Sequence, residues 1–213
     1  MAGVNEQAPV IVSFQSLADE ILKTESPRLV AVDGRGGSGK TTFATRLARL
    51  LPAVVVIEVD DFLNWSDLDD WWPRVEDEAI TPLLAGERAR FRIRDWDTDP
   101  LGESLDGWRD VGPADTIILE GVTSSRASMA QRLSMSFWLE APPNVRLARG
   151  LARDGQTMRS TWQNWMRLED EFFERDDAPG RATYVVVGDA AVPYDEETEA
   201  LLLGLTGGTW RAG

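Results

Sequence analysis

Five short runs of β-branched and other apolar residues punctuate the chain and are typical of buried strands. They cover residues 28–32, 53–59, 116–120, 135–139 and 183–187. Elsewhere apolar residues recur every three or four positions, which is the period of an amphipathic helix. This period predicts helices over residues 12–24, 41–51, 144–154, 161–174 and 196–205. Strands that alternate with helices indicate an α/β fold, in which helices cover both faces of a parallel sheet.

The chain changes character between about residues 61 and 113, where it is acidic and rich in tryptophan. A helical pattern covers residues 71–84, and arginines alternate with apolar residues over 89–96, as in a half-exposed strand. We interpret this stretch as a substrate-binding insert within one domain that spans residues 1–213. Residues 1–9 are expected to be a loose tail, and they lack the features of a signal peptide.

A glycine-rich turn between the first buried strand and the next helix matches G-x-x-x-x-G-K-[ST], the P-loop or Walker A motif. Glycines let successive backbone N–H groups point at an anion, and the helix N-terminus adds partial positive charge there. We expect Lys40 to reach the β- and γ-phosphates of a nucleotide and Thr41 to ligate Mg²⁺. The predicted nucleotide-binding residues are Gly34, Gly36, Gly37, Ser38, Gly39, Lys40, Thr41 and Thr42.

Two further buried strands end on carboxylates. Glu120 is predicted to lie near the metal, with a solvated strand end as the alternative. Asp60 and Asp61 follow the strand at 53–59, at the sheet edge where ligands bind. Because side chains alternate along a strand, only one of the two can point at the phosphates and accept the proton of an attacking hydroxyl. We favour Asp60 for that role and leave Asp61 open.

Arg146, Arg149 and Arg153 have spacings of three and four and therefore share a helix face. Such a face is either solvated or closes over a triphosphate as a lid, here over about residues 144–160. We favour the lid, and the predicted catalytic residues are then Lys40, Asp60, Arg149 and Arg153.

The aromatic stripe formed by Trp162, Trp165 and Phe172 is interpreted as core, with a wall of the acceptor pocket as the alternative. Arg90, Arg92 and Arg94 share one face of the half-exposed strand, which we interpret as solvated or paired with the acidic insert, with a contact between Arg94 and substrate as the alternative.

The composition limits which groups can act as a general base and which partners the protein can bind. The chain has no cysteine and no histidine, so any general base is a carboxylate, lysine, tyrosine or water. With 36 acidic and 22 basic residues the net charge is −14, which argues against nonspecific binding to nucleic acid. No apolar run approaches the roughly 20 residues that span a bilayer. We therefore expect a cytoplasmic protein that binds neither nucleic acid nor membrane, and the composition leaves a homo-oligomer open.

In these motifs the chain resembles the uridine kinase and phosphoribulokinase group of P-loop kinases, and uridine-kinase-like proteins in particular. The resemblance covers most of residues 28–188. It rests on the order and spacing of Val-Asp-Gly-Arg-Gly-Gly-Ser-Gly-Lys-Thr-Thr at 32–42, Val-Asp-Asp-Phe at 59–62, Arg-Asp-Trp at 94–96, Leu-Glu-Gly at 119–121 and Arg-Leu-Ala-Arg-Gly-Leu-Ala-Arg-Asp at 146–154.

The resemblance implies a P-loop NTPase fold of the nucleoside-kinase type, with five parallel strands in the order 2-3-1-4-5. It also implies transfer of the γ-phosphate of ATP, with Mg²⁺, to a primary hydroxyl. By position, Asp60 matches the catalytic aspartate and Glu120 the acidic residue near the metal. Arg149 and Arg153 match the lid arginines, and Asp154 follows them as in the family. Asp95 and Trp96 match an Asp-aromatic pair that lies beside the nucleoside in uridine kinases.

Three departures leave the acceptor open. Uridine kinases carry a histidine in the base-recognition region, and this chain has none. Their segment that holds the ribose hydroxyls is replaced here by Asp-Leu-Asp-Asp-Trp-Trp-Pro-Arg at 67–74. Glycine stands at 150, where an additional lid arginine is common.

The sequence thus predicts an ATP-dependent phosphotransferase acting on a small-molecule alcohol, for which a nucleoside is one candidate. The alternative is a nucleotide-dependent regulatory ATPase or switch that acts on a protein partner.

Overall fold

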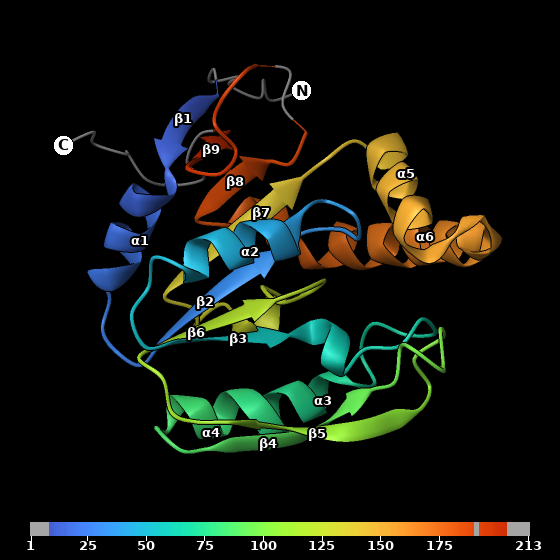
Figure 1. The fold of residues 1–213 in the computed structure, drawn as a ribbon, viewed down its shortest axis with the longest axis horizontal. Coiled ribbons are helices and arrows are strands. Elements are labelled where there is room, and N and C mark those ends of the chain that lie inside the picture. The colour runs from blue at the N-terminus through green and yellow to red at the C-terminus, as the bar shows by residue number, and fades with distance from the viewer. Residues whose placement is uncertain (1–8, 190–191, 204–213) are drawn as a thin grey trace.

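The computed structural model describes residues 9–189 and 192–203, and a seven-stranded sheet lies at its centre (Figure 1). Its strands stand in the order β1-β9-β8-β7-β2-β6-β3, and a separate hairpin pairs β4 with β5. The strands are β1 (Val10–Ser13), β2 (Arg28–Asp33), β3 (Val54–Glu58), β4 (Ala89–Arg94), β5 (Leu105–Val111), β6 (Thr116–Glu120), β7 (Met135–Glu140), β8 (Tyr184–Val187) and β9 (Glu199–Leu202). The α-helices are α1 (Phe14–Leu22), α2 (Lys40–Ala48), α3 (Trp72–Arg74), α4 (Thr81–Leu84), α5 (Pro143–Asp154), α6 (Arg159–Asp176) and α7 (Ala178–Arg181).

The neighbouring strands β3, β6, β2, β7 and β8 run parallel to one another. Numbered along the chain, these five strands have the order 2-3-1-4-5, and they coincide with the five apolar runs of the sequence. The sheet nevertheless has seven strands in the described residues, because β9 and β1 extend it by antiparallel pairing.

Both added strands correct the sequence prediction. The helix expected over 196–205 is wrong for its described part, since Glu199–Leu202 form β9, and residues 204–205 lie outside the described residues. Pairing with β1 and β8 buries the side chains of β9. This burial stabilises a strand, although the apolar residues of the segment follow a helical period. The helix expected from residue 12 begins instead at Phe14, where the hydroxyl of Ser13 accepts a hydrogen bond from the backbone N–H of Ser16. The tail predicted over residues 1–9 falls almost entirely outside the described residues.

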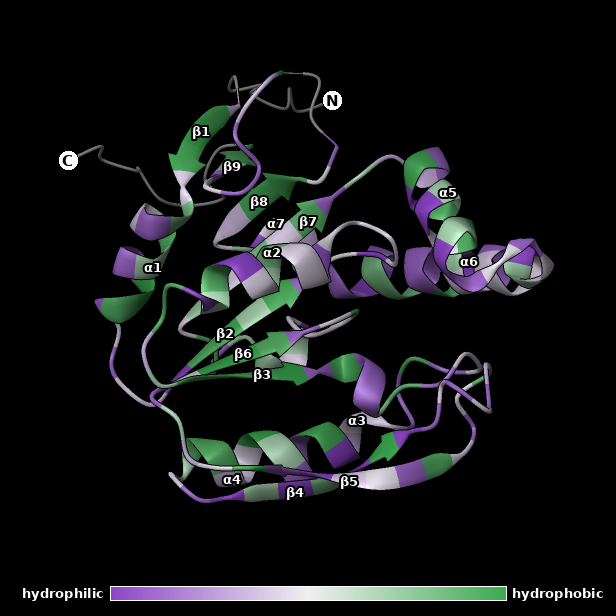
Figure 2. Cartoon of the chain, viewed as in Figure 1, coloured by the Kyte–Doolittle hydropathy of each residue, from purple (hydrophilic) through white to green (hydrophobic). Residues whose placement is uncertain are grey.

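The central strands are hydrophobic along most of their length (Figure 2) and send side chains into two separate cores. Val30 and Ile118 pack on one face against α1 and α2. Leu29 and Leu119 lie on the other face, against the insert and α6. Alternation along the strands thus yields the helix-covered parallel sheet that the sequence predicts.

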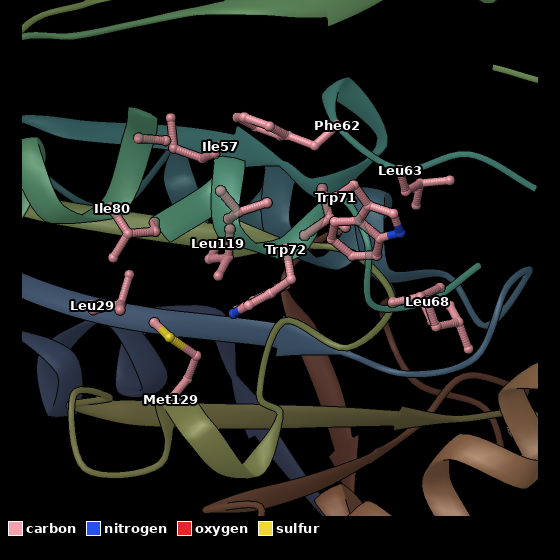
Figure 3. Close-up of a cluster of buried hydrophobic side chains, with 14 of the residues drawn as sticks. Leu29, Ile57, Phe62, Leu63, Leu68, Trp71, Trp72, Ile80, Leu119 and Met129 are labelled. Atoms are coloured by element: carbon pink, nitrogen blue, oxygen red, sulfur yellow. The ribbon is translucent and has the colours of Figure 1, made fainter. Parts of the chain in front are cut away.

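The insert is anchored by aromatic packing. Trp71, Trp72 and Ile80 share one hydrophobic cluster with Leu29 and Leu119, on the face of the sheet that the insert covers (Figure 3). Its helical stretch is continuous from α3 through a π-helical segment, Val75–Ile80, into α4. Strand β5, which pairs with β4 in the hairpin, was not predicted from the sequence, because its Asp-Gly-Trp-Arg-Asp centre is polar and mostly exposed.

Candidate active site

The P-loop joins β2 to α2 at the edge of the sheet where the parallel strands end (Figure 1). Gly37 has φ +77°, and a Cβ there would lie 2.5 Å from the carbonyl oxygen of Arg146, so a side chain is excluded. The Lys40 side chain is 8% exposed, and its Nζ donates a hydrogen bond of 3.1 Å to the carbonyl oxygen of Arg35. The lysine is therefore held across the loop at the start of α2.

Glu120 ends the central strand β6 and faces the first turn of α2. The Thr41 hydroxyl donates a 3.2 Å hydrogen bond to its Oε1. Burial raises the pKa of Glu120 to about 7, with Lys40 opposing the rise and the nearby carboxylates of Asp60 and Glu58 adding to it. A cation placed beside Thr41 would stabilise the ionised carboxylate.

The described residues contain no group of three or more Asp, Glu, His or Cys side chains that could hold a metal by themselves. A hydroxyl and a carboxylate are, however, a fitting protein contribution to a Mg²⁺ shell, which water and phosphate oxygens usually complete.

Asp60 and Asp61 have different surroundings. The Asp61 carboxylate accepts a 2.6 Å ion-pair hydrogen bond from Arg109 of β5, whose other guanidinium nitrogen donates to the carbonyl oxygen of Val56. The pKa of Asp61 is raised by burial, which Arg109 opposes. Asp60 is exposed and lines the pocket beside the P-loop. The geometry therefore gives Asp61 a structural partner and leaves Asp60 facing the site.

The pocket has a volume of about 860 Å³ and runs along the P-loop with a distinct lining at each end. We call one end the aromatic side; its apolar lining residues are Leu63, Trp65, Trp96, Pro100, Val122, Met158, Trp162 and Trp165, and the charged residues Asp60, Arg153 and Asp154 line the pocket beside them. The other end lies against α1, α2 and β8 and is lined by Phe14, Arg46, Val186, Gly188, Tyr194 and Glu196, among others. Lys40, Thr41 and Glu120 lie between the two ends and also line the pocket.

The three arginines of α5 divide into two groups. Arg149 and Arg153 line the pocket. Arg149 donates to the carbonyl oxygen of Gly37 at 3.3 Å, and Arg153 pairs with Asp154 at 2.7 Å. Arg146 is 2% exposed and pairs with the buried Glu169 of α6 at 3.2 Å, so its inclusion in a lid face is wrong. Its spacing matched the others, but the packing of α5 on α6 turned it inward.

Of the three predicted substrate contacts on the insert, only Trp96 lines the pocket. The Trp96 indole lines the pocket and donates a 2.8 Å hydrogen bond to the backbone carbonyl of Asp60. Arg94 donates to the carbonyl oxygens of Phe62 and Glu103. Asp95 accepts from the backbone N–H of Thr98 at 3.0 Å and also from its hydroxyl. Neither Arg94 nor Asp95 is among the residues that line the pocket. Both shape the loop that presents Trp96.

The aromatic stripe of α6 serves as both core and pocket wall. Trp162 and Trp165 are 2% and 3% exposed, and both line the pocket. Phe172 lies in the core beneath the sheet. The two interpretations of this stripe were thus not exclusive.

Two buried carboxylates that support the P-loop escaped the sequence analysis. Asp33 accepts hydrogen bonds from the backbone N–H groups of Gly34, Thr123 and Ser125 and from the Ser125 hydroxyl. Glu169 accepts from the backbone N–H of Gly36 at 2.6 Å and from the Trp165 indole at 2.7 Å, besides its pairing with Arg146. Asp33 could have been suspected because it directly precedes the P-loop. Glu169 shares the face of its helix with Trp162, Trp165 and Phe172, which indicates a buried carboxylate, but its distant partners Gly36 and Arg146 could not be predicted from that pattern.

Fold and site together define a P-loop nucleotide-binding protein of the α/β class, with its phosphate loop at the end of a parallel sheet. A family model described as an AAA domain matches residues 30–175, and the chain belongs to this family.

Related proteins point to small-molecule kinases, as the motifs predict. The chain is 24% identical over 151 residues to a uridine kinase of Ureaplasma parvum, covering 62% of this chain and 72% of that protein. A structure described as a possible uridine kinase from Bacillus stearothermophilus superposes with a TM-score of 0.60 at 21% identity, covering 81% of this chain and 96% of that one. The D-glycerate 3-kinase of Cryptococcus neoformans gives a TM-score of 0.53 at 15% identity, covering 88% and 98%. At such identities the structural matches establish the shared fold.

No helix in the described part of the chain is long and apolar enough to cross a membrane.

Proposed function

We propose that the protein is an ATP-dependent kinase that transfers the γ-phosphate to an alcohol group of a small molecule. The observation that carries this proposal is that Lys40, the Thr41–Glu120 pair and the exposed Asp60 line one pocket. A phosphate site alone would suit any nucleotide-binding protein. A carboxylate beside that site suits transfer to a hydroxyl, because the proton of the hydroxyl needs an acceptor.

In the proposed reaction the acceptor oxygen attacks the γ-phosphorus and forms a new P–O bond. The bond from that phosphorus to the bridging oxygen breaks, ADP leaves with the electron pair, and the Asp60 carboxylate takes the hydroxyl proton. Lys40, Arg149 and Arg153 neutralise the charge of the phosphates. Thr41 and Glu120 would hold Mg²⁺, which when bound neutralises phosphate charge and helps to orient the phosphates.

The two ends of the pocket support a direction for the substrates. With the triphosphate on the P-loop, the nucleoside of ATP would lie toward α1 and β8, near Phe14 and Tyr194. The acceptor would then lie on the aromatic side, next to Asp60. The insert supplies Leu63, Trp65, Trp96 and Pro100 to that side, which supports its role in binding the acceptor. The uridine kinase relative makes a nucleoside one candidate acceptor, and we expect the enzyme to act in the cytoplasm, on ATP.

The test is ADP release from Mg-ATP in the presence of nucleosides, sugars and cofactor precursors, with the phosphorylated product identified by mass. Lys40→Ala should lower turnover at least about 100-fold, because it removes the charge that stabilises the transferring phosphoryl group. Lys23→Ala is the matched control, since Lys23 is the only other lysine of the chain and lies exposed at the end of α1.

The proposal is wrong if Lys40→Ala retains most of the phosphotransfer. Hydrolysis of ATP without transfer to any acceptor, coupled to nucleotide-dependent binding of a protein, would instead favour a regulatory ATPase. The kinases among the relatives do not favour that alternative.

A further inference from the structure

The carboxylate of Glu169 touches the P-loop, although it carries the same sign of charge as the phosphates that such a loop binds. Its Oε1 accepts the backbone N–H of Gly36 at 2.6 Å and the indole N–H of Trp165 at 2.7 Å. Glu169 is 0% exposed and lies on α6, 133 positions after Gly36 along the chain. The packing of α6 beside the P-loop therefore brings the carboxylate and the loop together.

The surroundings of Gly36 favour this contact. A Cβ at position 36 would lie 3.0 Å from a ring atom of Trp162 and 3.2 Å from Oε1 of Glu169, so a side chain there would crowd the carboxylate. Trp165 stands four residues before Glu169 on the same helix, and its indole holds the carboxylate in place. Glycine thus lets the loop backbone approach an acceptor that is already fixed.

Arg146 balances the charge that Glu169 brings to the loop. The two side chains are buried and pair at 3.2 Å. Burial raises the pKa of Glu169, and the hydrogen bond from Gly36 opposes this rise. The charges of Lys40 and Arg146 oppose it as well. Because its charge is balanced, the carboxylate can hold a backbone N–H beside the phosphate site without adding net repulsion to a triphosphate.

Helices α5 and α6 lie against each other (Figure 1), and they also hold the residues on either side of Gly36. Arg35 pairs with Asp170 of α6 at 2.8 Å. The carbonyl oxygen of Gly37 accepts a hydrogen bond of 3.3 Å from Arg149 of α5. Three consecutive residues of the P-loop are therefore tied to the helix pair that also carries the proposed catalytic arginines.

From these contacts we infer that Glu169 is a positioning residue: it orders residues 35–37 of the P-loop for the triphosphate and keeps them in register with the arginines of α5. The inference rests on the proposed function and holds whichever alcohol is the acceptor. Glu169 does not line the pocket, so it acts through the loop backbone and not on a substrate. Without this anchor the nucleotide would have to order the loop itself, and that cost would weaken its binding.

Two double variants separate the hydrogen bond to Gly36 from the ion pair. Arg146→Met with Glu169→Gln removes both charges and keeps an amide oxygen that can accept from Gly36. Arg146→Met with Glu169→Leu removes both charges and the acceptor. Both should fold, because neutral groups that replace a buried ion pair as a pair are often tolerated.

The measurement is the Kd for Mg-ADP by isothermal titration calorimetry, which needs no acceptor. We expect the Kd of the Gln double variant to stay within about threefold of the native value, and that of the Leu double variant to rise at least about tenfold. With an accepted alcohol, kcat should fall further in the Leu variant than in the Gln variant, because the register between the loop and the arginines of α5 is lost.

The exposed ion pair Arg167–Glu171 lies on the same helix and supplies the matched control. Arg167→Met with Glu171→Leu should leave the Kd for Mg-ADP unchanged. Equal Kd values for the Gln and Leu double variants, both folded by circular dichroism, would overturn the inference and leave the proposed function standing. A native chain that does not bind Mg-ADP would overturn the proposed function together with the inference.

Amide hydrogen exchange tests the same contact without a substitution. In the nucleotide-free native chain, the Gly36 N–H should exchange at least about 100-fold more slowly than in an unstructured peptide, as followed by NMR on ¹⁵N-labelled protein. An unprotected Gly36 amide would overturn the inference, even where neither double variant folds.

Discussion

At the scale of single residues, two adjacent aspartates show how much a role depends on partners. Asp60 and Asp61 are indistinguishable by type and differ by one position. Arg109 comes from the strand that the sequence analysis missed, and its pairing with Asp61 explains why the choice between the two aspartates had to stay open. A distant cation thus decides which carboxylate is structural.

The pair offers a matched test of the proposed base. Asp60→Asn should lower kcat by about 10²–10⁴-fold, because an amide cannot take the proton of the acceptor hydroxyl. Its melting temperature should stay near that of the native chain, since the Asp60 side chain is exposed. Steady-state kinetics and differential scanning fluorimetry measure the two effects separately.

Asp61→Asn should show the opposite pattern. Here the side chains of Asp61 and Arg109 are 18% and 31% exposed. Loss of the charge partner should therefore cost about 1–3 kcal/mol of unfolding free energy, while kcat of the folded fraction is retained. If Asp61→Asn abolishes turnover and Asp60→Asn does not, the two roles are exchanged.

At the scale of elements, helix α5 has a structural side and a pocket side. The side chains of Arg146 and Glu169 are buried and pair with each other, and Glu169 also holds the P-loop through the backbone of Gly36. Arg149 is 43% exposed and reaches the P-loop from the pocket side. The same periodic arginine stripe therefore supplies both a buried brace and a candidate catalytic group.

Substitutions on the two sides should separate stability from catalysis. Arg146→Met should lower the unfolding free energy by about 3–5 kcal/mol, because it leaves Glu169 buried without its cation. Arg149→Ala should lower kcat about 10–100-fold through lost charge stabilisation, with an unchanged melting temperature. Urea denaturation and steady-state kinetics on both variants check this. A stability loss in Arg149→Ala equal to that in Arg146→Met would show that α5 has no such division.

Sequence periodicity was sufficient for elements whose burial depends on their own residues. The five parallel strands and the P-loop helix were predictable because their apolar runs are long enough to identify a buried strand or a helix face. Strand β5 was not, because its centre is polar and mostly exposed, and β9 was not, because it pairs with β1, almost 200 positions away in the chain. In the site, motif spacing identified the phosphate loop and Glu120. The aromatic side was only half visible, because Trp65 and Trp162 lie almost 100 positions apart and meet through packing of the insert on α6.

At the scale of the whole molecule, the excess of acidic residues opposes the compact state. The net charge is −14, while the proposed substrate ATP is itself anionic. The cations Lys40, Arg46, Arg149 and Arg153 line the pocket, so binding would rely on these local charges within an overall repulsive field. The same field acts on the fold, since like charges on one surface destabilise it.

This repulsion predicts that added salt stabilises the native chain. Raising NaCl from about 20 to 500 mM shortens the screening length from roughly 20 to 4 Å and should raise the melting temperature by about 2–5 °C. Chloride is chosen because sulfate or phosphate would bind the P-loop and stabilise it locally.

Lys40→Ala is the control: if the effect comes from the whole surface, the melting temperature of the variant should rise by as many degrees as that of the native chain. A gain that vanishes in Lys40→Ala would assign the stabilisation to an anion at the P-loop. A melting temperature that falls with salt would mean that ion pairs such as Arg46–Glu197 and Arg109–Asp61 outweigh the net repulsion.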